Sequence, residues 1–124
     1  MDKKLILIAS EKISAAQLKN LCHYWFDDMV KVVVDIKKEI VALGGELHAE
    51  AEALLIEQGS DQKALWGANF YPWHEPENRI EFTALINIRP KQDNPSMEIL
   101  DHNIKGKIAE IVERYVLAAD EKLV

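Results

Sequence analysis

Residues 64–90 read ALWGANFYPWHEPENRIEFTALINIRP and contain two strand-like runs separated by a polar loop. Successive side chains of a strand point to opposite faces, so the second run predicts an apolar face and a polar face. The apolar face would carry Ile80, Phe82, Ala84, Ile86 and Ile88, and the other face Arg79, Glu81, Thr83, Leu85, Asn87 and Arg89. The loop at 73–78 has hairpin length, so we expect the two runs to pair as antiparallel neighbours.

The same reasoning predicts six further elements outside this stretch. A short strand is expected at 5–8, inside the sheet, and two further strand runs at 30–36 and 39–43 would form either a hairpin or one long bent strand. A helix is expected over about 15–26, starting with a capping box of Ser14 and Gln17, and a second helix at 49–58 would end at Gly59. A last helix would begin after Asp101, which caps it. Their order is β-α-β-β-α-β-β-α. We therefore expect one α+β domain over residues 1–124, with an antiparallel or mixed sheet and helices packed mainly on one face.

Composition excludes several classes of protein. The 124 residues carry 21 acidic and 15 basic side chains, a net charge of −6, which disfavours binding to nucleic acid. No apolar run reaches the roughly 18 to 20 residues that span a bilayer, and no signal peptide is recognised, so we expect a cytoplasmic protein without membrane contact. Cys22 is the single cysteine, which excludes an internal disulfide and thiolate clusters; we expect it to be a buried filler and expect no cofactor.

The polar face of the predicted strand pair is the first candidate site. It would bring together Asn69 and Tyr71 of the first run with Glu81, Thr83, Asn87 and Arg89 of the second. Amide and guanidinium groups two residues apart are directional donors of the kind that orient a carboxylate, amide or phosphate. Three interpretations stay open: a ligand site, a solvated face, and structural bonds from Asn87 and Arg89 to the loop at 91–98.

The second candidate is the segment that contains His48, Glu50 and Glu52. If it were extended, the three side chains would project to one side and form a ligand set for a divalent metal. If it is helical, only His48 and Glu52 share a face, and two ligands hold a metal weakly. We favour a helix start with acidic residues in its first turn, which leaves a small metal-assisted hydrolase, with Arg89 as an anion clamp, as the alternative function.

Two weaker candidates concern a loop and an aromatic residue. Arg89, Lys91 and Ser96 in and beside the loop at 90–96 could attract an anion at a helix N-terminus, but loop closure is the favoured role. Trp73 in a polar loop is a candidate interface anchor, so a pure interaction module would expose an apolar patch around it or around Trp25.

The chain resembles a small family of bacterial and archaeal proteins of unknown function. The resemblance rests on VVVDIKKEIVALGGELHAEAEALL (32–55), LWGANFYP (65–72), RIEFTALINIRP (79–90), NPSMEI (94–99) and KIAEIV (107–112), and covers about residues 12–116. Glu50 departs from the family pattern, which has aspartate there. The family implies one autonomous unit and brings no reaction, substrate or cofactor.

The sequence therefore predicts a binding or interaction domain rather than an enzyme. Asn69, Asn87 and Arg89 would hold a small polar or anionic ligand or a protein partner. A homodimer is expected, because small sheets often bury their exposed edges by pairing. Convergence of His48, Asn69, Asn87 and Arg89 on one concavity would mark the functional site, whereas scattered positions would indicate that each serves the fold.

Overall fold

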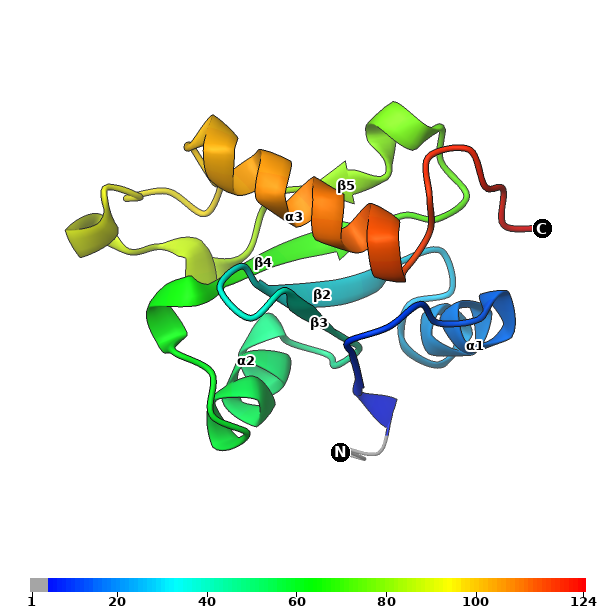
Figure 1. Ribbon diagram of the computed structural model, residues 1–124, viewed down its shortest axis with the longest axis horizontal. Helices are drawn as coiled ribbons and strands as arrows, with labels where there is room; N and C mark the ends of the chain where they lie inside the picture. Colours follow the sequence, from blue (N-terminus) through cyan, green and yellow to red (C-terminus); the bar gives the residue numbers. More distant parts are fainter. Residues whose placement is uncertain (1–4) are drawn as a thin grey trace.

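The computed structural model describes residues 5–124, which form an antiparallel sheet with three helices (Figure 1). The strands lie in the order β1-β3-β2-β4-β5, and every neighbouring pair is antiparallel. In chain order the elements are β1 (Leu7–Ala9), α1 (Ala15–Trp25), β2 (Val30–Asp35), β3 (Ile40–Leu43), α2 (His48–Glu57), β4 (Leu65–Phe70), β5 (Ile80–Glu81) and α3 (His102–Tyr115). The α+β class and the order of elements are confirmed, and the sheet is antiparallel.

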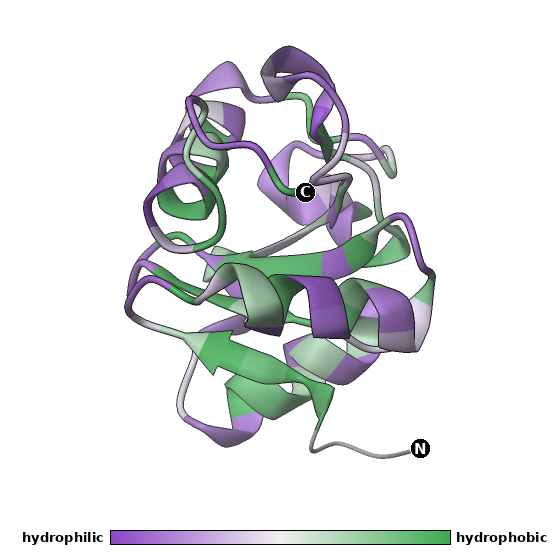
Figure 2. Cartoon of the chain, turned by 90° about the vertical axis from the view of Figure 1, so that its right-hand side faces the viewer, coloured by the Kyte–Doolittle hydropathy of each residue, from purple (hydrophilic) through white to green (hydrophobic). Residues whose placement is uncertain are grey.

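The sheet separates two hydrophobic clusters. Val32 and Val34 of β2 lie in the cluster that receives side chains from α1 and α3, whereas Val33 lies in the cluster that receives side chains from α2. In Figure 1 α3 lies above the strands and α2 below them, and Figure 2 shows hydrophobic residues concentrated along the strands between the helices. Two of the three helices thus share one face, and β2 and β4 are covered on both sides.

The turn between β2 and β3 depends on Asp35. Its buried carboxylate accepts hydrogen bonds from the backbone N–H groups of Lys37 and Lys38, both at 2.9 Å, and from the Ser60 hydroxyl at 2.7 Å. Glu39 completes the turn with a left-handed φ of 58°. A hairpin forms instead of one long bent strand, because the carboxylate supplies turn bonds that a Lys-Lys pair does not supply by itself.

The predicted helix starts are confirmed. The Ser14 hydroxyl accepts from the Gln17 N–H at 3.1 Å, and the Gln17 side chain accepts from the Ser14 N–H at 2.9 Å. Asp101 accepts from the Asn103 N–H at 2.7 Å at the start of α3. Cys22 is fully buried in α1, and burial raises the pKa of its thiol to about 12, as suits a core filler.

Two predictions about strands are wrong. Within residues 5–124, β1 is an edge strand that pairs only with β3, so it does not lie inside the sheet. The run at 80–88 is not a continuous strand, because β5 ends at Glu81 and residues 85–87 form a single turn of 3-10 helix. Ile88 is consequently 44% exposed while Asn87 is fully buried, the reverse of what the alternation predicts. None of the helices in residues 5–124 has the length and apolarity that crossing a bilayer requires.

Candidate functional site

The side chain of Asn87 forms hydrogen bonds along the outer edge of β4 that a neighbouring strand would otherwise form. Its amide oxygen accepts from the Gly67 N–H at 2.8 Å, and its amide nitrogen donates to the Gly67 carbonyl at 2.9 Å and to the Met97 carbonyl at 3.1 Å. A side-chain amide offers the same donor and acceptor as a peptide group, so Asn87 continues the hydrogen-bond ladder where β5 stops. Asn87 is therefore structural, in agreement with the interpretation in which it bonds the loop at 91–98, whereas the prediction that it lies on an open polar face is wrong.

Gly67 allows three neighbouring groups to approach β4 closely. A Cβ atom at this position would lie 2.7 Å from the Ala84 Cβ, 3.1 Å from a side-chain carbon of Ile86 and 3.2 Å from the His48 ring. The first of these separations is shorter than real side-chain contacts allow. The absence of a side chain at Gly67 thus lets the turn at 84–87 and the first turn of α2 meet over the same strand.

These elements enclose a pocket of about 300 Å³, which is the candidate functional site. The side chains of Leu47, Leu85 and Met97 border it and are 57%, 68% and 41% exposed. Exposed apolar groups around a hollow are typical of sites that bind a ligand or partner. The pocket is lined by Lys31, Leu47, His48, Ala49, Asn69, Thr83, Ala84, Leu85, Ile86 and Met97.

His48, the first residue of α2, is a buried group in this pocket. Its Nε2 lies 2.8 Å from the carbonyl oxygen of Ala68, which can only accept, so Nε2 carries the proton and Nδ1 keeps its lone pair. Burial lowers the pKa of His48, against the hydrogen bond to the Ala68 carbonyl, which raises it. The positive charge of Lys31 lowers this pKa further, and the neighbouring Asn69 side chain raises it by a smaller amount, so the net direction is downward. Near neutral pH the ring is therefore neutral and offers a hydrogen-bond acceptor.

Asn69 supplies the second acceptor in the pocket. Its amide nitrogen donates to Glu81 at 2.7 Å, while its Oδ1 is buried and has no hydrogen-bond partner among the described residues. Lys31 faces Asn69 across the β2–β4 register and also lines the pocket. Tyr71 is not among the residues that line the pocket. Its hydroxyl lies 3.5 Å from Glu81, and its pKa is raised mainly by burial and secondly by the negative charge of Glu81.

The three predicted metal ligands do not act together. The segment is helical, and Glu50 accepts from the backbone N–H groups of Glu46 and Leu47 at 2.9 and 2.8 Å, so it caps α2. Glu52 pairs with Arg89, and His48 is bonded to a backbone carbonyl. Within residues 5–124 no group of three His, Cys, Asp or Glu side chains is placed to hold a metal ion.

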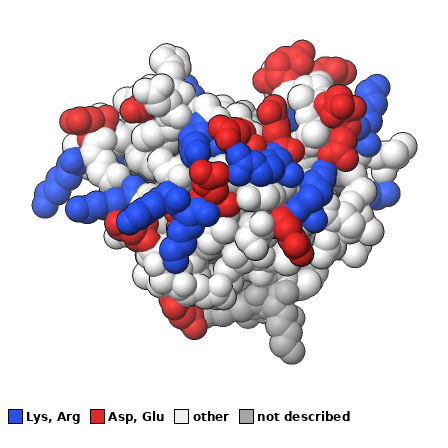
Figure 3. Space-filling model, viewed as in Figure 1, with Lys and Arg blue, Asp and Glu red and all other residues white. Residues whose placement is uncertain are grey.

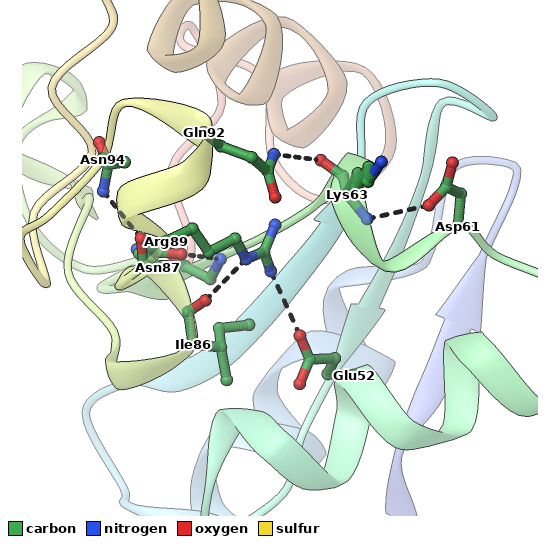
Figure 4. A network of polar contacts seen from close by, with 9 residues as sticks. Glu52, Asp61, Lys63, Ile86, Asn87, Arg89, Gln92 and Asn94 are labelled. Atoms are coloured by element: carbon green, nitrogen blue, oxygen red, sulfur yellow. Dashed lines mark hydrogen bonds and ion pairs between the residues drawn. The ribbon is translucent and has the colours of Figure 1, made fainter.

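Arg89 lies outside the pocket and bonds α2 to the segment that follows β5 (Figure 4). Its Nη2 lies 3.2 Å from Glu52, with both side chains nearly buried, and its Nε donates to the Ile86 carbonyl at 3.0 Å. Burial lowers the pKa of Arg89, and the charge of Glu52 opposes that effect. Of the four residues whose convergence would mark a site, only His48 and Asn69 meet in one pocket.

The loop at 90–96 is closed by Asn94. The Asn94 side chain donates to the carbonyls of Asn87, Ser96 and Glu98 and accepts from the Leu100 N–H, with all four distances between 2.8 and 3.1 Å. These contacts agree with the favoured role of loop closure.

Trp73 is 39% exposed and lies 5.7 Å, between ring centroids, from His23. The apolar side chains that border the pocket are more exposed than Trp73, so an interaction surface is better placed at the pocket than at this residue.

Sequence reasoning did not identify Lys31, Leu47, Leu85 or Met97 as site residues. Lys31 had a local signal, because it is the only polar residue between the apolar residues of VKVVV. Leu47 and Met97 had none, since an apolar residue becomes part of a pocket border only when distant segments meet around it.

The fold and the pocket define a small α+β domain with an antiparallel sheet and an amphiphilic hollow containing a neutral histidine. The chain belongs to the family described as "Protein of unknown function (DUF5674)", which it matches over residues 7–115. This match confirms the resemblance to a family of unknown function. Neither the curated proteins nor the solved structures contain a match to the chain.

Proposed function

We propose that this domain binds a small amphiphilic molecule in the pocket at His48 and Asn69, without a chemical step. The observation that carries this proposal is the Asn69 side chain, which lines the pocket and whose Oδ1 atom is buried without a partner among the described residues. A buried acceptor without a partner costs on the order of 1 to 3 kcal/mol, so such atoms in folded proteins generally have a bonded group. A ligand that donates a hydrogen bond would remove that cost.

The pocket groups limit the chemistry of the ligand. Asn69 Oδ1 and His48 Nδ1 are both acceptors, so the polar end should carry a neutral donor such as a hydroxyl or amide N–H. Lys31 disfavours a cationic donor at the same position. The apolar body would lie against Leu47, Leu85 and Met97 and remove part of their exposed surface from water.

A binding role accounts for this arrangement better than metal-assisted hydrolysis. The Nε2 atom of His48 is occupied by the Ala68 carbonyl, and Glu50 and Glu52 are occupied by a helix cap and an ion pair. The candidate hydrolytic groups therefore serve the fold, and Arg89 does not reach into the pocket as an anion clamp.

The proposal can be tested with benzamide, which has an apolar ring and an amide donor, and with N,N-dimethylbenzamide, which lacks the donor. Nuclear magnetic resonance titration should show saturable shifts at the Asn69 side chain and the His48 ring with benzamide, and weaker binding of the dimethyl compound. Ala49→Phe at the pocket should abolish these shifts. Ala53→Phe, one turn further along α2 and exposed, should retain them. Equal binding to both variants, or no shift at Asn69, would refute the proposal.

The cytoplasmic location and the homodimer are also part of the proposed function. β1 and β5 are the edges of the sheet within residues 5–124, and both are short. Pairing of two β1 edges would satisfy their open backbone groups. Light scattering at micromolar concentration should give the mass of a dimer, and a monomer mass would count against this association.

A further inference from the structure

A second hollow, of about 600 Å³, lies between two short turns on the other side of the segment that follows β5. It is lined by Gln62, Lys63, Arg89, Pro90, Lys91 and Gln92, three of which are cationic and none of which is acidic. Figure 3 shows several Lys and Arg side chains, with Asp and Glu side chains among them, at the left of this view, where the turns at 62–64 and 90–92 lie in Figure 1. This concentration is notable because the chain as a whole carries a net charge of −6.

Arg89 is incompletely bonded in this hollow. Its Nε and Nη2 atoms have partners in Ile86 and Glu52, but its Nη1 atom is buried and has none among the described residues. Arg79 provides a contrast within the same chain, since its three side-chain nitrogens donate to three backbone carbonyls. A buried guanidinium N–H without an acceptor is costly, which indicates an acceptor that belongs there.

Trp66 adds a second free donor beside Arg89. The guanidinium carbon of Arg89 lies 4.8 Å from the centroid of the Trp66 ring, and the indole Nε1 atom is also buried without a partner among the described residues. The contact with the Trp66 ring, the ion pair with Glu52 and the Nε bond to Ile86 together restrict the position of the guanidinium. The direction in which Nη1 donates is therefore set before any ligand arrives.

The turns that border the hollow are also held in place. Gln92 donates from its side chain to the Lys63 carbonyl at 3.0 Å, which joins the two turns. Asn94 fixes the end of the same loop through its four hydrogen bonds. In Figure 4 the unbonded guanidinium nitrogen of Arg89 points toward the side where Gln92 and Lys63 lie. An anion would reach this nitrogen by moving the Gln92 side chain, which breaks its bond to Lys63.

We propose that this hollow binds the phosphate group of a small molecule, with Arg89 Nη1 as the directional donor and Lys63 and Lys91 as the neutralising charges. Glu52 already balances the charge of Arg89, so Lys63 and Lys91 contribute two further positive charges among the residues that line the hollow. That excess matches a dianionic phosphate better than a single carboxylate. Lys63 and Lys91 form no ion pair within the described residues, so both are available.

The proposal is tested with inorganic pyrophosphate and with succinate at one ionic strength. Pyrophosphate should bind saturably and shift the Gln92 side-chain amide and the Trp66 indole N–H in nuclear magnetic resonance spectra, whereas succinate should bind at least about tenfold more weakly. Lys63→Gln/Lys91→Gln should weaken pyrophosphate binding about tenfold or more. These lysines are exposed, and replacing them leaves the Arg89–Glu52 pair intact.

Lys19→Gln/Lys37→Gln is the matched control, because it removes the same charge from lysines outside this hollow. It should leave the affinity for pyrophosphate nearly unchanged. If pyrophosphate binding were weakened equally in the two double variants, the effect would depend on net charge alone, and the proposal would be overturned. So would equal affinity for succinate, or shifts that avoid both Gln92 and Trp66. None of these outcomes bears on the His48 pocket, which uses other residues.

Discussion

Replacing Asn87 should remove a large part of the stability of this domain. Asn87→Ala would leave the Gly67 N–H, the Gly67 carbonyl and the Met97 carbonyl without their partner in a fully buried place. Each unsatisfied buried group costs about 1 to 3 kcal/mol, and water entering the vacated space would recover part of that cost. We expect a loss of about 3 to 5 kcal/mol, against a total of about 5 to 15 kcal/mol for an ordinary domain.

Asn87→Asp tests the direction of each hydrogen bond. One carboxylate oxygen can still accept from the Gly67 N–H, but the other would face two carbonyl oxygens and can donate to one of them only when it is protonated. The pKa of this carboxyl in the folded state should therefore lie above its unfolded value of about 3.9. The folded state then binds more protons, so the variant should lose stability relative to wild type as the pH rises from about 4 to 7.

Urea denaturation at several pH values, followed by tryptophan fluorescence, measures both effects. Asn20→Asp is the control, because it makes the same chemical change at an exposed position of α1 and should stay within about 0.5 kcal/mol of wild type. A loss below about 1 kcal/mol in Asn87→Ala would refute the strand-replacement role of Asn87. A flat difference between Asn87→Asp and wild type across pH would refute the assignment of donor and acceptor.

Four further substitutions test other supports of the site and of the fold. Because burial lowers the pKa of His48 in the folded state, the unfolded state binds more protons, and wild-type stability should fall as the pH drops from about 7 to 5. The loss should be about 1.4 kcal/mol for each unit by which the folded pKa lies below the unfolded pKa. Urea titrations of His48→Gln should lack this pH-dependent loss. Gly67→Ala should cost about 1 to 3 kcal/mol in thermal unfolding, because its Cβ would lie 2.7 Å from that of Ala84; an unchanged melting temperature would contradict the close approach. Asp35→Ala should cost about 2 to 4 kcal/mol and Ser60→Ala about 1 kcal/mol by the same urea assay, because the first removes three hydrogen bonds and the second removes one.

The parts of the fold predicted from the sequence are those in which the deciding interactions are local. The capping box of Ser14 and Gln17 spans four residues, and the apolar periodicity of α3 lies within one helix. The β2–β3 hairpin was left open beside a bent strand, because its turn depends on Asp35, whose third bond comes from Ser60, 25 residues away. A pattern read over a short window does not contain that bond.

The strand prediction is wrong for residues 82–88, because alternating polarity does not distinguish a strand from an irregular segment packed along a strand. The conformation of these residues is set by Asn87 and Gly67, which are 20 residues apart, and by the close contact that the missing side chain of Gly67 permits. Asparagine and glycine both favour turns, so the two residues were visible in the sequence, but their pairing was not. The same reason explains why Arg89 was assigned to one face together with Asn69.

The polar residues that first suggested a single site divide into groups that hold a segment and groups that face a hollow. Residues 83–86 and Met97 border the His48 pocket, and residues 89–92 border the cationic hollow, so one irregular segment forms part of both. With little regular structure, that segment is held by the side-chain amides of Asn87 and Asn94. Loss of Asn87 should therefore weaken ligand binding in both hollows, although this residue lines neither of them.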